Sequence, residues 1–202
     1  IQTLRAEGNF PITGLALHRE FINSLACVKK AAAIANRDAG RLEPRIADAI
    51  IRACDEIAAG KLHNQFVVDQ IQGGAGTSMN MNANEVIANR AIELLGGTKG
   101  DYALVHPNDH VNCGQSTNDV IPTAGKLTTL RLLEGLRKEL IALQKAFDSK
   151  AKAFDGIIKM GRTQMQDAVP VRLGQEFMAY ADSVKRSIRR MDIAAQEMKT
   201  LN

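Results

Sequence analysis

A single apolar stripe extends from Val120 to Phe154, and it limits the folds open to this chain more than any other feature. Its members are Val120, Ala124, Leu127, Leu130, Leu133, Leu136, Leu140, Leu143, Phe147, Ala151 and Phe154. Steps of three and four residues place them on one face of an α-helix far longer than a typical globular helix. Such a helix needs long partners, so the sequence predicts a bundle of long helices.

A second long stripe runs to the C-terminal end of the sequence. Its members are Phe177, Ala181, Val184, Ile188, Met191, Ala195 and Met198. Their alternating steps of four and three are the 3.5-residue repeat of supercoiled helix packing. The stripe has neither a cap nor a glycine before Asn202. We therefore expect the natural chain to continue, and other long helices, from this chain or another, to cover the stripe.

Shorter helices are expected before this region. Apolar periodicity and helix-ending glycines define them, and Pro44 is well suited to a first helical turn. Residues 65–69, QFVVD, are β-prone and predict a short extended connector. The helices expected are one that carries the stripe from Leu17 to Ala35 and ends at Gly40, one that runs from Pro44 to just before Gly60, and one over residues 84–95.

Composition excludes several classes of protein. The chain has 202 residues, of which 45% are hydrophobic and 24% charged, as in ordinary globular proteins. Its net charge is only +4 and its basic residues are scattered, which argues against a nucleic-acid partner. No apolar run approaches the ~18 residues of a membrane span, so no membrane partner is expected. Composition does not exclude the binding of a small anionic ligand.

The cysteines predict the redox setting. Cys27, Cys54 and Cys113 are odd in number and form no CxxC pair. This argues against a disulfide framework and against a structural zinc site. We expect a reducing, cytoplasmic location, with no metal ion and no cofactor. The sequence also begins without Met, which suggests a fragment.

Three polar stretches interrupt the helical pattern, each at an expected helix entrance. They are QGGAGTSMNMN (72–82), HPNDHVNCGQSTND (106–119) and GRTQMQDAVPVRLGQEF (161–177). Glycines allow close backbone approach, and free N–H groups at a helix start attract anions. Each stretch can therefore hold a ligand, or it can be a loop that ends in a helix cap. In the first stretch, Thr77 or Ser78 would be that cap.

The second stretch has more capping residues than one helix needs. Four consecutive residues are good N-cap residues, namely Ser116, Thr117, Asn118 and Asp119, and Pro122 is tolerated only near the first turn. One cap is enough, so the others are left as donors at the helix start. His106 and His110 lack partners at suitable spacing for a metal site, which favours surface or capping roles.

In the third stretch, Gly161 is expected to break regular structure and Pro170 to begin the last helix. Asp167 is a plausible cap for that helix. Thr163 and Gln164 then lie in the lead-in to it.

Taken together, the three stretches resemble the successive signature regions of the aspartase/fumarase superfamily. IQTLRAEGNFPI (1–12) also resembles a segment close to the start of those enzymes, so the likeness covers nearly the whole chain. It implies an all-α fold: a small helical N-terminal domain, here residues 1–112, and a partial central domain of long bundled helices, residues 113–202. It also implies a homotetramer that assembles through the long helices, which would cover the exposed stripes.

The reaction implied by the resemblance is the reversible elimination of ammonia from L-aspartate to give fumarate. Removing a proton beside a carboxylate creates an aci-carboxylate dianion, which needs preorganised hydrogen-bond donors. By the resemblance, the residues that bind the substrate are Thr77, Ser116, Thr117, Asn118 and Thr163, and Gln164 orients it.

Two further features of the family bear on this reading. Fumarases use the HPND part of the second stretch as a secondary anion site, so His106, Asn108 and Asp109 either bind a second ligand or shape the turn, and we favour shape. Fumarases also carry His where this chain has Gln164, and an amide cannot relay a proton at neutral pH. Gln164 therefore argues against a fumarate hydratase, which stays the main alternative. A non-catalytic helical assembly module is another.

The family's proton-abstracting serine lies on a GSSxMPxKxN-type loop, and no such segment occurs between Ile1 and Asn202. Each active site of the family also combines regions from three subunits. The resemblance thus implies that the general base lies outside this sequence. We expect the 202-residue chain alone to be inactive.

Overall fold

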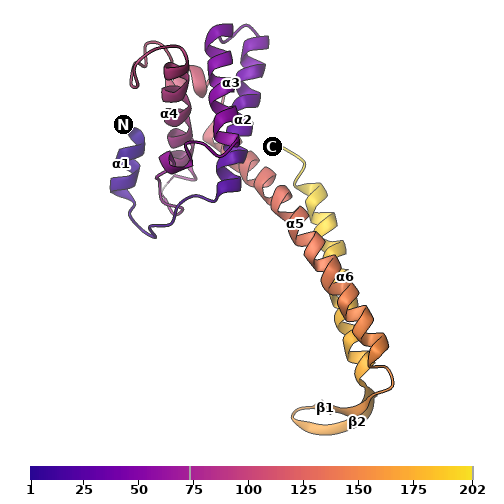
Figure 1. Cartoon of the computed structure of the whole chain (residues 1–202). Helices are drawn as coiled ribbons and strands as arrows, with labels where there is room; N and C mark the ends of the chain where they lie inside the picture. Colours follow the sequence, from indigo (N-terminus) through magenta and orange to yellow (C-terminus); the bar gives the residue numbers. More distant parts are fainter. Residues whose placement is uncertain (73, 202) are drawn as a thin grey trace. The chain divides into compact units, whose positions relative to one another are not determined.

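The structure is a computed structural model that describes residues 1–72 and 74–201; Gly73 of the first polar stretch and the terminal Asn202 lie outside them. Figure 1 shows its elements in chain order. The helices are α1 (Gln2–Asn9), α2 (Arg19–Asp38), α3 (Pro44–Ala58), α4 (Thr77–Leu94), α5 (Thr117–Ala153) and α6 (Leu173–Glu197), with two short turns of helix, η1 (His63–Gln65) and η2 (Pro107–Val111). The strands are β1 (Ile158–Thr163) and β2 (Gln166–Arg172).

The all-α prediction is confirmed, with one small hairpin added. The chain forms two compact units, unit 1 (Ile1–Thr129) and unit 2 (Leu130–Leu201), and α5 begins in the first and continues in the second. The domain division after residue 112 stays a prediction. None of the described helices combines the length and apolar composition that a membrane span requires.

Unit 1 is built around α2, α3 and α4, which pack against one another (Figure 1). Pro44 stands in the first turn of α3, as predicted. Residues from all three helices are fully buried in one core, and removing such apolar surface from water is the main stabilising term. The buried residues include Leu25, Ile50, Ile57, Ile87 and Ile92.

The buried face of α2 differs from the predicted stripe. Leu25 belongs to both, but the other buried positions include Ile22, Lys29 and Ala33. The predicted Phe21 and Val28 only flank the core. Because α2 is rich in apolar residues, two neighbouring series of positions have helical spacing, and the series that faces the core includes a lysine.

The helix α4 extends further towards the N-terminus than its apolar periodicity indicates. It begins at Thr77 with Gly76 as its N-cap, so the predicted cap at Thr77 or Ser78 is one or two residues too late, and the periodic segment 84–95 covers only the later part of the helix. Three asparagines in this part, Asn80, Asn82 and Asn84, are buried, with at most 2% of their surface exposed. Buried amides hide the apolar periodicity on which the prediction depended.

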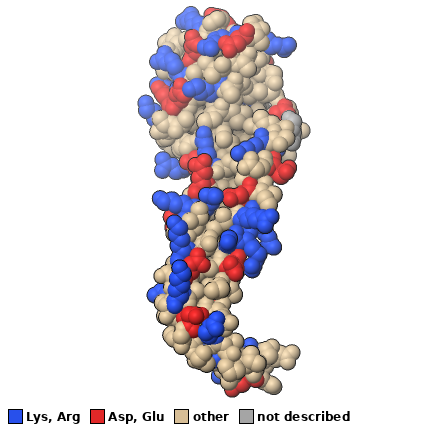
Figure 2. All heavy atoms as spheres, turned by 90° about the vertical axis from the view of Figure 1, so that its right-hand side faces the viewer, with Lys and Arg blue, Asp and Glu red and all other residues tan. Residues whose placement is uncertain are grey.

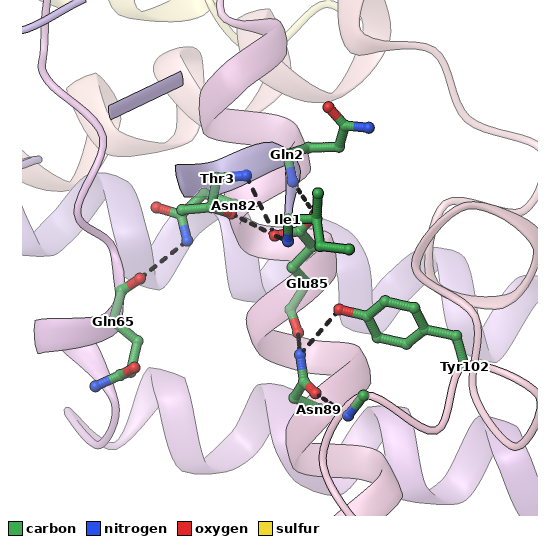
Figure 3. A network of polar contacts seen from close by, with 9 residues as sticks. Ile1, Gln2, Thr3, Gln65, Asn82, Glu85, Asn89 and Tyr102 are labelled. Atoms are coloured by element: carbon green, nitrogen blue, oxygen red, sulfur yellow. Dashed lines mark hydrogen bonds and ion pairs between the residues drawn. The ribbon is translucent and has the colours of Figure 1, made fainter. Parts of the chain in front are cut away.

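The short helix α1 is held in place by Glu85 of α4 (Figure 3). The Glu85 carboxylate accepts hydrogen bonds from the N–H groups of Gln2 at 2.8 Å and Thr3 at 3.2 Å, and from the Thr3 hydroxyl at 2.7 Å. Burial raises the pKa of Glu85, but these hydrogen bonds outweigh it, so the pKa is lowered overall. A carboxylate at a helix N-terminus satisfies free N–H groups and the helix dipole. Glu85 is therefore a cap that α4 supplies to α1.

Unit 2 consists of the rest of α5, the hairpin and α6. Phe154 and Phe177 meet edge-to-face with ring centroids 5.2 Å apart, and Arg137 binds Asp192 at 2.8 Å further along. These contacts make α5 and α6 an antiparallel pair (Figure 1). Gly174 N–H donates to the Phe154 carbonyl at 3.1 Å. A Cβ at residue 174 would clash with the Ala151 carbonyl oxygen, so only glycine permits this close approach.

The hairpin corrects the prediction for the third polar stretch. Gly161 lies inside β1, and Pro170 lies inside β2, opposite Met160, instead of starting a helix. Asp167 caps nothing and binds Arg162 at 3.0 Å. The helix α6 begins only at Leu173. Both strands are exposed on both faces, so they lack the alternation of apolar and polar residues that identifies a strand in a sequence.

Much of the apolar surface of unit 2 stays exposed in the single chain. The exposed residues of α5 and α6 include Leu132, Leu136, Leu143, Met178, Tyr180 and Ile193. On the face drawn in Figure 2, basic and acidic residues are interspersed over much of the surface, and basic residues gather on part of the long helices. The exposed basic residues of α6 include Lys185, Arg186, Arg189 and Arg190.

Candidate substrate-binding site

The starts of α4 and α5 meet in unit 1. Gly76, the N-cap of α4, has φ 88°, and a Cβ there would lie 2.9 Å from Cγ2 of Ile121 in α5. Glycine thus allows the first loop to reach the second helix. Asn80 Nδ2 in α4 donates to Thr117 Oγ1 at the start of α5, at 3.2 Å. Two of the three polar stretches are therefore joined within one unit.

The cap of α5 is Ser116. The N–H of Asn118 donates to Ser116 Oγ at 3.2 Å, and the Asp119 carboxylate accepts the Ser116 N–H at 3.3 Å. This reciprocal pair is a capping-box arrangement that satisfies the first turn. Ser116 and Asn118 are exposed and Thr117 is half-buried. Side chains in this turn can therefore reach a ligand without disturbing the helix.

The hydroxyl groups near this point are not equivalent. Ser116 Oγ accepts from Asn118 N–H, and Thr117 Oγ1 accepts from Asn80. Each keeps its own O–H hydrogen free to donate to an anion. The Thr77 hydroxyl, in contrast, donates to the Gly74 carbonyl at 2.7 Å, so its hydrogen is already engaged. Ser116 and Thr117 are the better placed donors.

A buried amide network lies under the second stretch, and sequence analysis missed it. Lys29 Nζ donates to Asn112 Oδ1 at 2.8 Å and to Gln115 Oε1 at 3.0 Å. Asn80 and Asn84 donate to the same Asn112 oxygen, each at 3.2 Å. A lysine at helical spacing from Ile22, Leu25 and Ala33 was the available signal, because a charge on a buried face needs a polar partner.

The HPND segment folds into a compact turn. His106 caps η2, and its Nδ1 accepts the N–H groups of Asn108 at 3.3 Å and Asp109 at 3.2 Å. His110 Nδ1 in turn accepts the His106 N–H at 2.9 Å. Asn108 and Asp109 are exposed. The two histidines thus shape the backbone here; whether His106, Asn108 and Asp109 also bind an anion stays a prediction.

Thr163 and Gln164 belong to unit 2, whereas the residues described above belong to unit 1. Thr163 ends β1 and Gln164 opens the hairpin turn, where Gln164 and Met165 have φ 48° and 63°. Two consecutive left-handed residues are typical of the tight turn that joins antiparallel strands. Both predicted site residues are exposed. Their roles stay predictions.

Comparison with known proteins decides the family. Residues 1–202 match the family model described as Lyase. The chain belongs to this lyase family. It is 59% identical over 202 residues to the aspartate ammonia-lyase of Bacillus subtilis (strain 168), a match that covers 100% of this chain and 42% of the relative. It is 55% identical over 201 residues to the class II fumarate hydratase of Halobacterium salinarum, covering 99% of this chain and 43% of the relative.

Solved structures agree with this assignment to the lyase family. The fumarate lyase:delta crystallin from Brucella melitensis in native form superposes with TM-score 0.95 and 50% identity, over 100% of this chain and 47% of that one. The class II fumarase from Schistosoma mansoni gives TM-score 0.91 and 37% identity, over 100% and 43%. The resemblance seen in the polar stretches is confirmed. The chain spans less than half the length of the curated relatives it matches.

Proposed function

We propose that this chain is part of an aspartate ammonia-lyase, which eliminates ammonia reversibly from L-aspartate to give fumarate. The observation that carries the proposal is the meeting of α4 and α5, where two oriented hydroxyl groups stand at the start of a long helix. The 59% identity to the Bacillus subtilis enzyme of that name supports the same substrate. The proposal involves no cofactor and no metal.

The chemistry needs donors for a carboxylate whose charge grows. A base removes a proton from C3 of L-aspartate, and the electron pair moves into the adjacent carboxylate as an aci-carboxylate dianion. The electrons then return to form the C2–C3 double bond as the C2–N bond breaks and ammonia leaves. The Ser116 and Thr117 hydroxyls and the Asn118 amide can donate to the dianion, and the positive end of the α5 dipole adds to its stabilisation.

The remaining predicted residues complete this proposal. Thr77 binds the substrate from α4, and Thr163 and Gln164 contact it from the hairpin. Active sites of the family combine regions from different subunits, so the hairpin that completes a site need not belong to the same subunit as α4. Gln164 orients the substrate and does not transfer protons. His106, Asn108 and Asp109 shape the turn.

We also propose that the full-length protein is a homotetramer, assembled through α5 and α6. The exposed Leu132, Leu136 and Leu143 support this, because a contiguous apolar helix face is normally covered in an assembly. Analytical ultracentrifugation of the full-length protein tests it. A monomer at micromolar concentration would contradict it.

Because no serine loop of the family type occurs in the sequence, we propose that the 202-residue chain alone is inactive. Continuous measurement of fumarate absorbance with L-aspartate tests this, and clear turnover would contradict it.

A hybrid enzyme tests the function itself. The matching segment of the Bacillus subtilis relative is replaced by this chain, and fumarate formation is followed with L-aspartate and, separately, with malate. We expect fumarate and ammonia from L-aspartate only. Conversion of malate to fumarate, together with consumption of fumarate in the absence of ammonia, would favour the fumarate hydratase alternative. The 55% identity to the Halobacterium enzyme supports that alternative. A folded tetramer that binds neither substrate would favour a non-catalytic assembly module.

A further inference from the structure

Lys29 in α2 is an unusual residue for a protein core. Its side chain is fully buried, with 0% of its surface exposed. Its two hydrogen-bond partners are amide oxygens, of Asn112 and Gln115, and not carboxylates. Burying an amine without an opposite charge is unfavourable, and an apolar residue of the same length would avoid that cost. A specific task for the amine would account for its presence.

Asn112 is the centre of the network that Lys29 joins. Its Oδ1 accepts from Lys29, Asn80 and Asn84, and its Nδ2 donates to the Gln115 carbonyl at 3.0 Å. The Oδ1 atoms of Asn80 and Asn84 are buried and, among the residues described, have no partner. Both amides direct their N–H groups at Asn112. The network is thus organised around holding this one residue.

Gln115 carries the connection into the backbone. While its Oε1 accepts from Lys29, its Nε2 donates to the carbonyls of Val111 at 2.9 Å and Cys113 at 3.2 Å. Gln115 directly precedes Ser116, the cap of α5. Every step between the buried amine and the start of α5 is therefore a hydrogen bond or a peptide bond.

We propose that Lys29 is a positioning residue: through Asn112 and Gln115 it fixes the loop 112–117, and so places Ser116 and Thr117 at the start of α5. The inference rests on the proposed function only for what Ser116 and Thr117 do there. The neutral amine and the ammonium both have enough N–H groups for the two acceptors, so the loop is held in either protonation state.

The neighbouring Lys30 provides a matched control. Its side chain is half-buried and pairs with Asp55 at 2.6 Å, outside the network around Asn112. Lys29→Met and Lys30→Met each replace a lysine by an unbranched apolar residue of similar length. Only the first removes donors from the network.

Hydrogen–deuterium exchange of the 202-residue chain, read by mass spectrometry, tests the proposal. In Lys29→Met we expect exchange in 112–118 to rise at least about tenfold, while exchange in the cores of α3 and α4 and the far-ultraviolet circular dichroism stay as in the wild type. Lys30→Met should match the wild type throughout. Wild-type exchange of 112–118 in a folded Lys29→Met chain would overturn the proposal.

A second variant covers the case in which Lys29→Met does not fold. Gln115→Met removes one acceptor of Lys29 at a half-buried position and leaves Asn112 in place, so the core of unit 1 should persist. Its exchange in 112–118 should also rise, and an unchanged rate would overturn the link from Lys29 to the loop.

Kinetics separate this inference from the proposed function. In the hybrid enzyme, Lys29→Met should lower kcat by about tenfold to a hundredfold, as expected for misplaced binding groups, with Lys30→Met unchanged. A loosened loop with wild-type kcat would support the positioning by Lys29 and count against the proposed role of Ser116 and Thr117.

Discussion

Replacing Lys29 by Met should remove a pH dependence from the stability of unit 1. Burial lowers the pKa of the Lys29 amine from 10.5 to about 7, an effect that the nearby Cys54 only partly opposes. Between these values the unfolded chain binds a proton that the folded chain does not. The free energy of unfolding therefore rises with pH in this window. The same lysine destabilises the fold most below about pH 7.

The size of the effect follows from the two pKa values. Each unit of difference is worth about 1.4 kcal/mol, and at pH 7 the folded amine is about half protonated. Integrating from pH 7 to pH 9 gives an increase of about 2 kcal/mol in the wild type. Cys54 acts in the opposite direction only above its ordinary value of 9.0, because burial raises its pKa to about 12. Up to pH 9 the rise due to Lys29 therefore exceeds the opposing effect of Cys54.

Urea unfolding at pH 7, 8 and 9 measures this. The Tyr180→Phe background leaves Tyr102 as the only tyrosine, so its fluorescence reports unit 1 alone. We expect the free energy of unfolding to rise across the series in the Tyr180→Phe chain and to stay flat, apart from other titrations, when Lys29→Met is added. Lys30→Met should keep the wild-type rise. Parallel curves for Lys29→Met and its background would refute the buried, titrating amine.

Three further results are expected. Glu85→Gln removes the charged cap of α1, so proteolysis within residues 1–9 should become faster. Unit 1 should lose about 1 kcal/mol of stability above the ordinary pKa of the carboxyl, and progressively less as the pH falls below that pKa. Equal cleavage of the variant and the wild type would contradict the capping role. Thr117→Val in the hybrid enzyme should lower kcat by about a hundredfold to a thousandfold, the usual effect of losing a donor to a developing oxyanion, and a change below threefold would exclude that role. Gly76→Ala should lower the melting temperature of unit 1 through strain worth about 1–3 kcal/mol, whereas Gly125→Ala, in a helix with open space around it, should leave it unchanged or raise it.

The long helices were predictable because their apolar stripes are long. The stripes beginning at Val120 and Phe177 fall on α5 and α6, and Pro44 marks the start of α3. Such periodicity persists over many turns, so a few exceptions do not hide it. The hairpin offered no such signal, since its strands are exposed on both faces, and Pro170 is more familiar at a helix start than in a strand.

The polar core was harder to foresee. Lys29 and Asn84 are buried because each finds partners in segments far along the chain, at Asn112. Sequence periodicity treats a lysine or an asparagine as a sign of exposure, and only the fold shows which partners satisfy it. The same holds for the candidate site. The motif containing Ser116 and Thr117 can be recognised in the sequence, whereas the hydrogen bond from Asn80 that joins Thr117 to α4 is seen only in the structure.

The hairpin is joined to the helices of unit 2 near its two ends, where Lys159 of β1 also pairs with Glu176 of α6 at 2.7 Å. Its base is closed by Leu173 N–H, which donates to the Ile157 carbonyl at 2.9 Å, and Gly174 seats α6 against the end of α5 just beyond. The residues between lie on the surface and support no core. The packing of the helix pair therefore does not depend on most side chains of residues 158–172, and the constraint on Thr163 and Gln164 comes from the substrate role proposed for them. Residue 174 must stay glycine, because any side chain there would push the two helices apart.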